Sequence, residues 1–364
     1  MQTAFMTKLK SNKTLKSNLI TFGMVIIAYI LIEILMSAGV LSNLLKGLLV
    51  PLCVYAILAV SLNLTVGILG ELSLGHAGFM CVGAFSSAFF SKCMQDVIPI
   101  AGVRFTLAII IGALSAGLFG ILIGIPVLRL KGDYLAIVTL AFGEIIKNLV
   151  NILYVGIDEN GFHFSTKSSL ELNLSENGTV IIQGAQGITG TPHDSNFTIG
   201  IVLLLLTLFI VLNLIHSRDG RAIMAIRDNT IAAESVGINI TKYKLMAFSL
   251  SAALAGLAGV LYAHNLSTLT ALPKNFGYNM SIMILVFVVL GGIGNIRGSI
   301  ISAVVLTLLP ELLRGLNDYR MLIYAVVLIV MMLFNWAPAC IQWREKMTYK
   351  LKSRKTLKTK GKEA

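Results

Sequence analysis

Long runs of apolar residues alternate with short polar stretches along this chain. Two of the clearest runs are NLITFGMVIIAYILIEILMSAGV at 18–40 and FTIGIVLLLLTLFIVLNLI at 197–215. Each run can cross a hydrocarbon core of roughly 30 Å as a helix, and each is too long and continuous for a barrel strand. The pattern therefore predicts an all-α fold, a polytopic transmembrane helical bundle.

About ten apolar segments of this kind follow one another along the chain. Gly and Pro interrupt several of them, so we expect about 8–10 membrane segments, some of them half-spanning. The segments lie at 18–40, 44–66, 74–91, 103–128, 133–155, 197–216, 245–266, 279–291, 298–315 and 319–337.

Small residues recur at a spacing of four within these segments. Such positions let helix backbones approach closely in a membrane, where no hydrophobic effect drives association. Two glycine-dense stretches, 66–85 and 290–309, also resemble each other, and interrupted helices at matching places are typical of transport pathways. The pairs at this spacing are Gly120/Gly124, Ala252/Gly256, Ala255/Gly259 and Gly294/Gly298.

Charge refines the picture of the chain ends. Only 13% of the residues are charged, against about 25% in a soluble domain, and the net charge is +12. Residues 1–17 and the tail 344–364 are strongly basic, and these basic residues sit at membrane edges. We therefore expect no nucleic-acid partner. By the positive-inside rule, both termini of a transmembrane domain at 18–343 are cytoplasmic.

Two loops support this topology. The loop 217–244 is predicted to be cytoplasmic, and the loop 156–196 extracytoplasmic, because basic residues collect on the cytoplasmic side. The first loop carries Arg218, Arg221, Arg227, Lys242 and Lys244; the second carries Asp158, Glu159, Glu171, Glu176 and Asp194 against Lys167.

Ionisable residues within apolar segments are expensive and often mark a pathway. We expect Glu71, Ser73, His76 and Glu144 to be candidates for the translocation path. Alternatives stay open: His76 could simply bond a backbone carbonyl, and Glu144 could form a local ion pair three residues along its helix. His264, near a helix end, is predicted to be interfacial.

Sequence motifs for catalysis are missing. The chain has no HExxH, GxSxG or Walker A pattern, and its four cysteines lack metal-ligand spacing. We expect a transport protein that is not an enzyme and binds no cofactor or metal. Any ATP would be used by partner subunits.

A compact polar block, RDGRAIMAIRDNTIAAESVGI at 218–238, has the features of a docking element. Asp228 or Asn229 can cap a short helix over 230–236, and Gly237 suits the left-handed position that ends one. The small Ala232 and Ala233 would let another protein surface approach. The alternative is a plain loop between two helices.

This block and four others resemble branched-chain amino acid ABC transporter permeases of the LivM type. The resemblance covers most of residues 50–315; the first 45 residues and the basic tail carry no family motif. The blocks are GRAIMAIRDNTIAAESVGINITKYKLMAFSLSAALAGLAGVLYA at 220–263, GILGELSLGHAGFMCVGAF at 67–85, LRLKGDYLAIVTLAFGEII at 128–146, GAQGITGTP at 184–192 and VVLGGIGNIRGSIISA at 288–303.

The resemblance implies an importer subunit in a bacterial cytoplasmic membrane. Its implied partners are a second homologous permease, two ATPase subunits and an extracytoplasmic binding protein, and its cargo is Leu, Ile or Val. Alternatives are an ABC permease for urea, an amide, a sugar or a nucleoside, or an ion-coupled secondary amino acid transporter. The residues that match the family's ATPase-coupling element are Arg221, Arg227, Asp228, Asn229, Ala232, Ala233, Glu234, Ser235 and Gly237.

Overall fold

The structure is a computed structural model. It describes residues 2–336 apart from 96, 130–132, 160, 176–177, 314 and 316–318, and the side chains of residues 2–17, 133, 320, 321, 324, 331 and 334–336 are not described. The predicted tail at 344–364 lies outside the described residues. The chain divides into two compact units, Met1–Val304 and Val305–Ala364.

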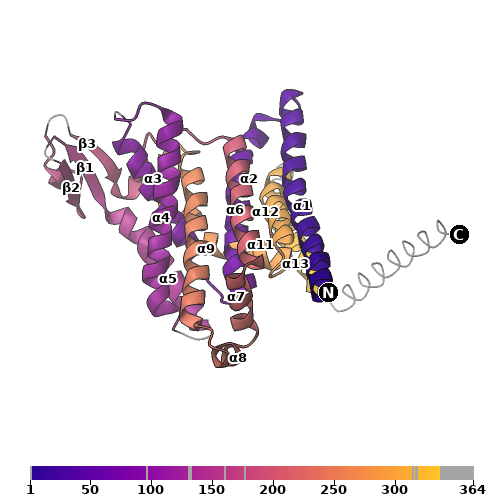
Figure 1. The fold of residues 1–364 in the computed structure, drawn as a ribbon. Helices are drawn as coiled ribbons and strands as arrows, with labels where there is room; N and C mark the ends of the chain where they lie inside the picture. The colour runs from indigo at the N-terminus through magenta and orange to yellow at the C-terminus, as the bar shows by residue number, and fades with distance from the viewer. Residues whose placement is uncertain are drawn as a thin grey trace. The chain divides into compact units, whose positions relative to one another are not determined.

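Helices make up most of the first unit (Figure 1). The prediction of a polytopic helical bundle is confirmed. The helices are α1 Gln2–Ser37, α2 Asn43–Asn63, α3 His76–Cys93, α4 Ala101–Val127, α5 Asp133–Ile152, α6 Phe197–His216, α7 Arg218–Asp228, α8 Thr230–Ser235, α9 Ile240–Ala263, α10 Pro273–Phe276, α11 Tyr278–Gly291 and α12 Ile296–Leu312.

Seven helical segments among the described residues are long and apolar enough to cross a membrane. The shorter or less apolar α3 and α12, and α13 at Arg320–Trp336, account for the remaining predicted segments. The seven are Asn18–Ser37, Asn43–Leu69, Ala101–Val127, Tyr134–Ile152, Phe197–His216, Ile240–Ala263 and Pro273–Gly291.

In the second unit, α13 exposes apolar side chains such as Ile329 and Leu333. This exposure suits a helix surrounded by lipid, because a bilayer solvates apolar side chains.

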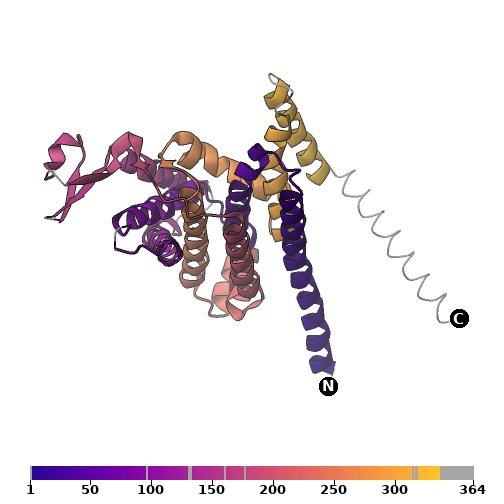
Figure 2. The ribbon, with the colours of Figure 1, turned by 90° about the horizontal axis from the view of Figure 1, so that it is seen from above.

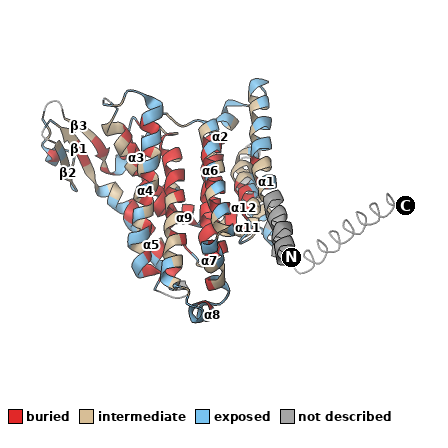
Figure 3. Cartoon of the chain, in the orientation of Figure 1, coloured by how far each residue is buried: buried red, intermediate tan, exposed pale blue. Residues whose placement is uncertain are grey.

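Helix α9 is the centre of the first unit. It packs against α2, α3 and α4, and Figure 2 shows these helices gathered around it. Buried residues concentrate on α2, α3 and α9, whereas α4 exposes much of its surface (Figure 3). The exposed part is apolar, with Leu114 and Leu118 among its residues, so α4 is suited to contact with lipid.

Close backbone approach explains the small residues of α9. A Cβ atom added to Gly259 would lie 2.1 Å from the carbonyl oxygen of Met80 in α3. A Cβ atom added to Gly256 would lie 2.3 Å from the Cβ of Ala116 in α4. The expectation that small residues spaced by four let helices pack closely is confirmed here, because no larger side chain fits.

The predicted loop at 156–196 contains a small sheet and is therefore not wholly irregular. Strands β1 Tyr154–Asp158, β2 Gly161–Ser165 and β3 Thr179–Gln183 form an antiparallel sheet in the order β2-β1-β3. Strands β4 Ile188–Thr189 and β5 Thr268–Leu269 form a second, two-stranded sheet. Alternation in GFHFS was the sequence signal for a strand, because side chains alternate faces in extended backbone.

Candidate functional site

The polar block at 218–238 folds into two consecutive helices, α7 and α8, which we call the α7–α8 segment. Helix α7 begins after Ser217, whose hydroxyl accepts from the amide of Gly220 at 3.0 Å. The sequence pattern predicted only the second helix. The segment lies at the opposite end of α6 from the small sheets, and Figure 1 shows α8 at the lower end of the bundle.

Both ends of α8 are capped by local hydrogen bonds. The side-chain oxygen of Asn229 accepts from the amide of Ala232 at 3.0 Å, so Asn229, and not Asp228, is the N-cap. At the other end Gly237 has a φ of +82°. Its amide donates to Glu234 O at 2.9 Å, and the amide of Ile238 donates to Ala233 O at 3.1 Å. These two bonds form a Schellman ending, which favours glycine at the left-handed position.

The surface of α8 differs from the one expected. Ala233 is only 3% exposed and packs within this chain, so it cannot offer a small surface to a partner. Ala232 is exposed, and beside it Ile231 and Val236 are 82% and 75% exposed. Large apolar side chains at such exposure favour a protein interface. Sequence reasoning missed both residues, although large apolar residues are few in the second half of the block.

Arg227 is exposed, as expected of a residue at the rim of the segment, and it also connects the α7–α8 segment to the helical core. Its guanidinium donates to the carbonyl oxygen of Gly67 at 2.9 Å and also bonds the carboxylate of Asp228. The aliphatic part of Arg227 lies over Gly70, where an added Cβ would come within 2.5 Å of Arg227 Cγ. The Arg221 guanidinium donates to His216 O at 3.2 Å and so caps a backbone carbonyl at the end of α6.

The remaining predicted residues of the segment, Glu234 and Ser235, are exposed on α8. The hydroxyl of Ser235 donates back to Ala232 O at 2.8 Å. The carboxylate of Glu234 has no hydrogen bond or ion pair within the part of the chain that the structure describes. The exposed face of α8 therefore combines one free carboxylate with two apolar side chains.

The partner of Arg227 belongs to an irregular helical turn. Helix α2 continues as a π-helix, η1 Leu64–Leu69, which ends at Gly70 with a φ of +82°. Single π-helical turns are rare and occur frequently at functional sites. Just beyond, Glu71 forms an ion pair with Lys244 in the first turns of α9. Two charged contacts therefore join the end of η1 to the α7–α8 segment and to the helix that follows it.

The two glycine-dense stretches meet at η1. The amide of Gly294 donates to the side-chain oxygen of Asn63 at 2.9 Å, and the Asn63 amide group donates to Ser299 Oγ at 2.8 Å. A Cβ added to Gly67 would lie 2.4 Å from Gly294 N. The two helix interruptions that looked alike in sequence therefore contact each other, and in transporters interrupted helices of this kind form the binding site.

The four candidates for the translocation path have separate partners. Glu71 pairs with Lys244. His76 is buried at the start of α3 and its Nε2 lies 2.7 Å from the hydroxyl of Ser61. Glu144 bonds Lys147 on its own helix and accepts from the amide of Tyr278 at 2.8 Å.

The fourth candidate, Ser73, is buried, and its hydroxyl has no hydrogen-bond partner among the described residues. No hydrogen bond or ion pair joins any two of the four in the described structure. The local ion pair that was the alternative for Glu144 is present. An unpartnered buried hydroxyl is costly, so Ser73 is the candidate with spare capacity to bind a polar group.

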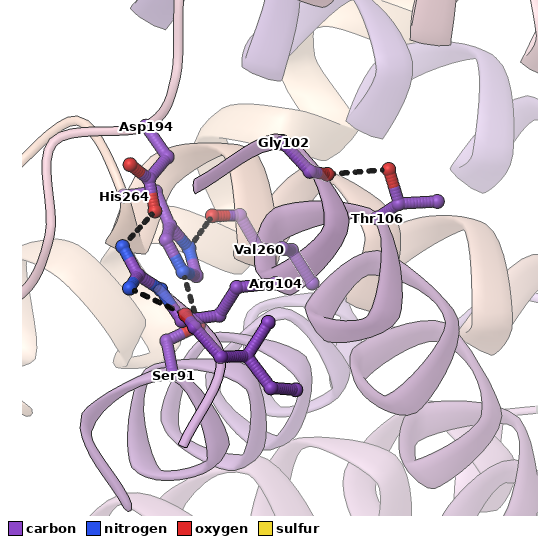
Figure 4. Close-up of polar contacts among 8 residues, drawn as sticks. Ser91, Gly102, Arg104, Thr106, Asp194, Val260 and His264 are labelled. Carbon is purple, nitrogen blue, oxygen red and sulfur yellow. Dashed lines mark hydrogen bonds and ion pairs between the residues drawn. The ribbon is translucent and has the colours of Figure 1, made fainter. Parts of the chain in front are cut away.

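A second polar cluster lies at the other end of α9 (Figure 4). His264 follows α9; its Nε2 lies 2.8 Å from Ser91 Oγ and its Nδ1 lies 3.0 Å from Val260 O. Beside it Arg104 forms an ion pair of 3.2 Å with Asp194. His264 is fully buried within the protein at the end of α9, and its position at the membrane interface stays a prediction. The cluster joins α3, α4 and α9 to the segment preceding α6.

No group of three His, Cys, Asp or Glu residues in the described ranges could hold a metal ion. Cys53, Cys81 and Cys93 are free cysteines, and Cys340 lies outside the described residues. The geometry instead offers a mechanical connection. Arg227 of α7 bonds the π-helix η1, and Lys244 of α9 bonds Glu71 just beyond it, so both helices that flank α8 are joined to the end of α2.

Comparison with known proteins identifies a family of membrane permeases. The family model described as branched-chain amino acid transport system / permease component matches residues 44–334. No solved structure matches this chain.

Three curated relatives illustrate the similarity. The high-affinity branched-chain amino acid transport system permease protein LivM of Salmonella typhimurium is 36% identical over 309 residues, which are 82% of this chain and 70% of that protein. LivM of Escherichia coli K12 is 35% identical over 294 residues, 78% and 67% of the two chains. The permease protein LivH of Salmonella typhimurium is 22% identical over 283 residues, 77% and 88%.

Proposed function

Because this chain belongs to the permease components of branched-chain amino acid transport systems, the LivM type, we propose a specific route by which it couples ATP use to import. The chain is a multi-pass membrane protein and a permease subunit of an ATP-driven branched-chain amino acid importer. The observation that carries this function is the family match over most of the chain together with the LivM identity.

We propose that the chain works without an ATPase site of its own. A second, similar permease completes the membrane pathway, two ATPase subunits dock on the cytoplasmic side, and an extracytoplasmic binding protein delivers Leu, Ile or Val. The similarity to LivH as well as to LivM supports a paired permease. The basic ends at 1–17 and 344–364 support cytoplasmic termini in a bacterial inner membrane, with 156–196 outside and 217–244 inside.

In this proposal, the α7–α8 segment seats in the ATPase. The exposed Ile231 and Val236 supply the apolar contact and Glu234 a polar edge, while Ala233 holds α8 against its own chain. A movement of the segment reaches η1 through the bond from Arg227 to Gly67 O. An ATPase shifts a permease between two states only by binding them with different affinity. A capped helix therefore transmits a movement of the ATPase better than a flexible loop would.

Two exposed apolar residues provide the test of this function. The double variant Ile231→Asp with Val236→Asp is assembled with the ATPases, the second permease and the binding protein in proteoliposomes. We expect loss of ATPase co-purification and of ATP-dependent uptake of radiolabelled leucine, because two charges would enter an apolar interface. The matched control is Leu170→Asp, which alters a similarly exposed leucine beside the small sheet.

Retention of the ATPases and of uptake in the double variant would contradict the docking assignment. Uptake by the purified chain alone along an ion gradient, with no ATPase present, would contradict the importer itself.

Leucine uptake is also competed with Ile, Val, urea, an amide, ribose and a nucleoside. Competition by Ile and Val alone supports the proposed cargo.

A further inference from the structure

A wholly apolar pocket of about 430 Å³ lies between the membrane helices and the three-stranded sheet. Its wall comes from α3, from the end of α5 and from the strands, and it contains no exposed polar surface. Its lining residues include Phe85 and Phe89, Val150 and Leu153, and Phe162 and Phe164.

The composition of the wall excludes the importer's own cargo. Small-molecule sites of this size normally carry a few polar groups that orient the ligand. The lining hydroxyl, Ser86, is already engaged, since it lies 2.7 Å from Ser115 Oγ and donates to Gly83 O. A free amino acid carries an ammonium and a carboxylate, and burying either without a partner is strongly unfavourable. The pocket therefore suits a ligand without polar atoms along its buried length.

The location of the pocket identifies the source of such a ligand. Helix α5 crosses the membrane over Tyr134–Ile152, and the pocket begins at its end with Val150 and Leu153. One face of α5 exposes large apolar side chains along its whole length, at Tyr134, Val138, Ile145, Leu149 and Ile152. In a membrane protein this exposed face contacts acyl chains. The lipid-facing surface of α5 thus ends at Ile152, the residue next to Leu153 in the pocket wall.

The strand β2 forms the side of the pocket away from the helices. Its residues alternate, and Phe162 and Phe164 are 52% and 67% exposed. The ring of Phe162 also lies 5.8 Å from the ring of Phe89 in α3, which closes one edge. Two exposed phenylalanines on one strand are explained if an apolar chain covers them, since exposed aromatic patches mark interaction sites.

We propose that this pocket binds one acyl chain of a bilayer phospholipid from the leaflet on the sheet side. The chain enters along the exposed face of α5 and lies between α3 and β2. A bound acyl chain would join the sheet to the helical bundle. This site is separate from the α7–α8 segment, which lies at the opposite end of α6.

The proposal is tested in the assembled importer in nanodiscs made with a phospholipid that carries a photoactivatable diazirine in one acyl chain. After illumination, the peptides that carry lipid are identified by mass spectrometry. We expect adducts on Phe89, Phe162 or Phe164, in addition to the general labelling of α4 and α5. Labelling confined to α4 and α5, with none on α3 or β2 around the pocket, would overturn the site.

A filling variant gives the second readout. Leu153→Trp places an indole into the pocket, where the empty volume provides room for it. We expect most of the adducts on β2 to disappear in this variant. The matched control, Ile145→Trp, adds the same side chain on the exposed face of α5, the helix that precedes Leu153, and keeps these adducts. Equal loss in both variants, or no loss in Leu153→Trp, would overturn the proposal.

Two further results distinguish a bound acyl chain from a polypeptide that covers the same pocket. A photoactivatable amino acid at Phe162 that captures the second permease or the binding protein, and no lipid, would replace the acyl chain by a polypeptide and overturn the proposal. Uptake is measured in proteoliposomes made with the same photoactivatable phospholipid, because uptake requires a closed vesicle. Normal uptake without pocket adducts would remove the lipid site and leave the importer function intact.

Discussion

At the residue scale, the bond from Arg227 to Gly67 is the contact on which the coupling route depends. Local sequence suggested a charged rim, because Arg227 stands in a polar block next to Asp228. The structure turns the guanidinium toward a carbonyl of η1, 160 residues away in sequence. In a π-helix the backbone hydrogen bonds follow a different pattern from those of an α-helix, and Arg227 donates to a backbone carbonyl of η1.

The variant Arg227→Ala is expected to reduce uptake while the ATPases still co-purify. A hydrogen bond from a charged group contributes about 1.5–3 kcal/mol, and its removal would uncouple the segment from η1. Uptake and ATP hydrolysis are measured together in proteoliposomes; we expect hydrolysis to persist with less transport. Arg218→Ala, an exposed arginine in the same helix, is the control and should transport normally. Equal transport by both variants would contradict the role of Arg227.

At the element scale, α8 shows how a very short helix is stabilised. Six residues are too few for a stable isolated helix, so its two caps and the buried Ala233 contribute much of its stability. The sequence predicted a capped helix over 230–236, and the structure confirms it except that the helix ends one residue earlier, at Ser235. The sheet β2-β1-β3 was missed because its strands are short and pair across a loop.

Two asparagine caps with the same geometry allow a matched comparison. Asn229 caps α8 and Asn239 caps α9, each accepting a main-chain bond of 3.0 Å. Replacing either asparagine by alanine lowers the stability of its helix by about 1 kcal/mol. In the six-residue α8 this loss is expected to accelerate amide hydrogen exchange through the helix and weaken ATPase binding. In the 24-residue α9 it should affect only the first turn. Equal exchange of α8 in wild type and Asn229→Ala would contradict this.

At the scale of the whole molecule, the seven apolar helical segments and the charge bias together predict how the chain lies in a membrane. The α7–α8 segment and the three-stranded sheet lie at opposite ends of α6. The charge bias predicts that the segment lies inside and the sheet outside, because basic loops stay in the cytoplasm. This arrangement puts the surface proposed for the ATPases and the acyl-chain pocket on opposite sides.

Orientation is checked with single cysteines in a cysteine-free background. Lys167→Cys, beside the sheet, should react with an impermeant maleimide in right-side-out vesicles. Lys242→Cys, in the first turn of α9, should react only in inside-out vesicles. Tags on both termini should be digested by protease in inside-out vesicles alone. The reverse labelling pattern would contradict cytoplasmic termini.

The sequence alone determined that this chain is a helical membrane protein, which family it belongs to, and where a short capped helix interrupts the apolar pattern. These properties depend on local composition and spacing, which can be read from the sequence without knowing the fold. Only the tertiary structure decided that Arg227 bonds Gly67, that His264 is buried, and that Phe89 and Phe162 enclose one pocket. Such contacts join residues far apart in the chain, and helix packing, not local pattern, sets which of them meet.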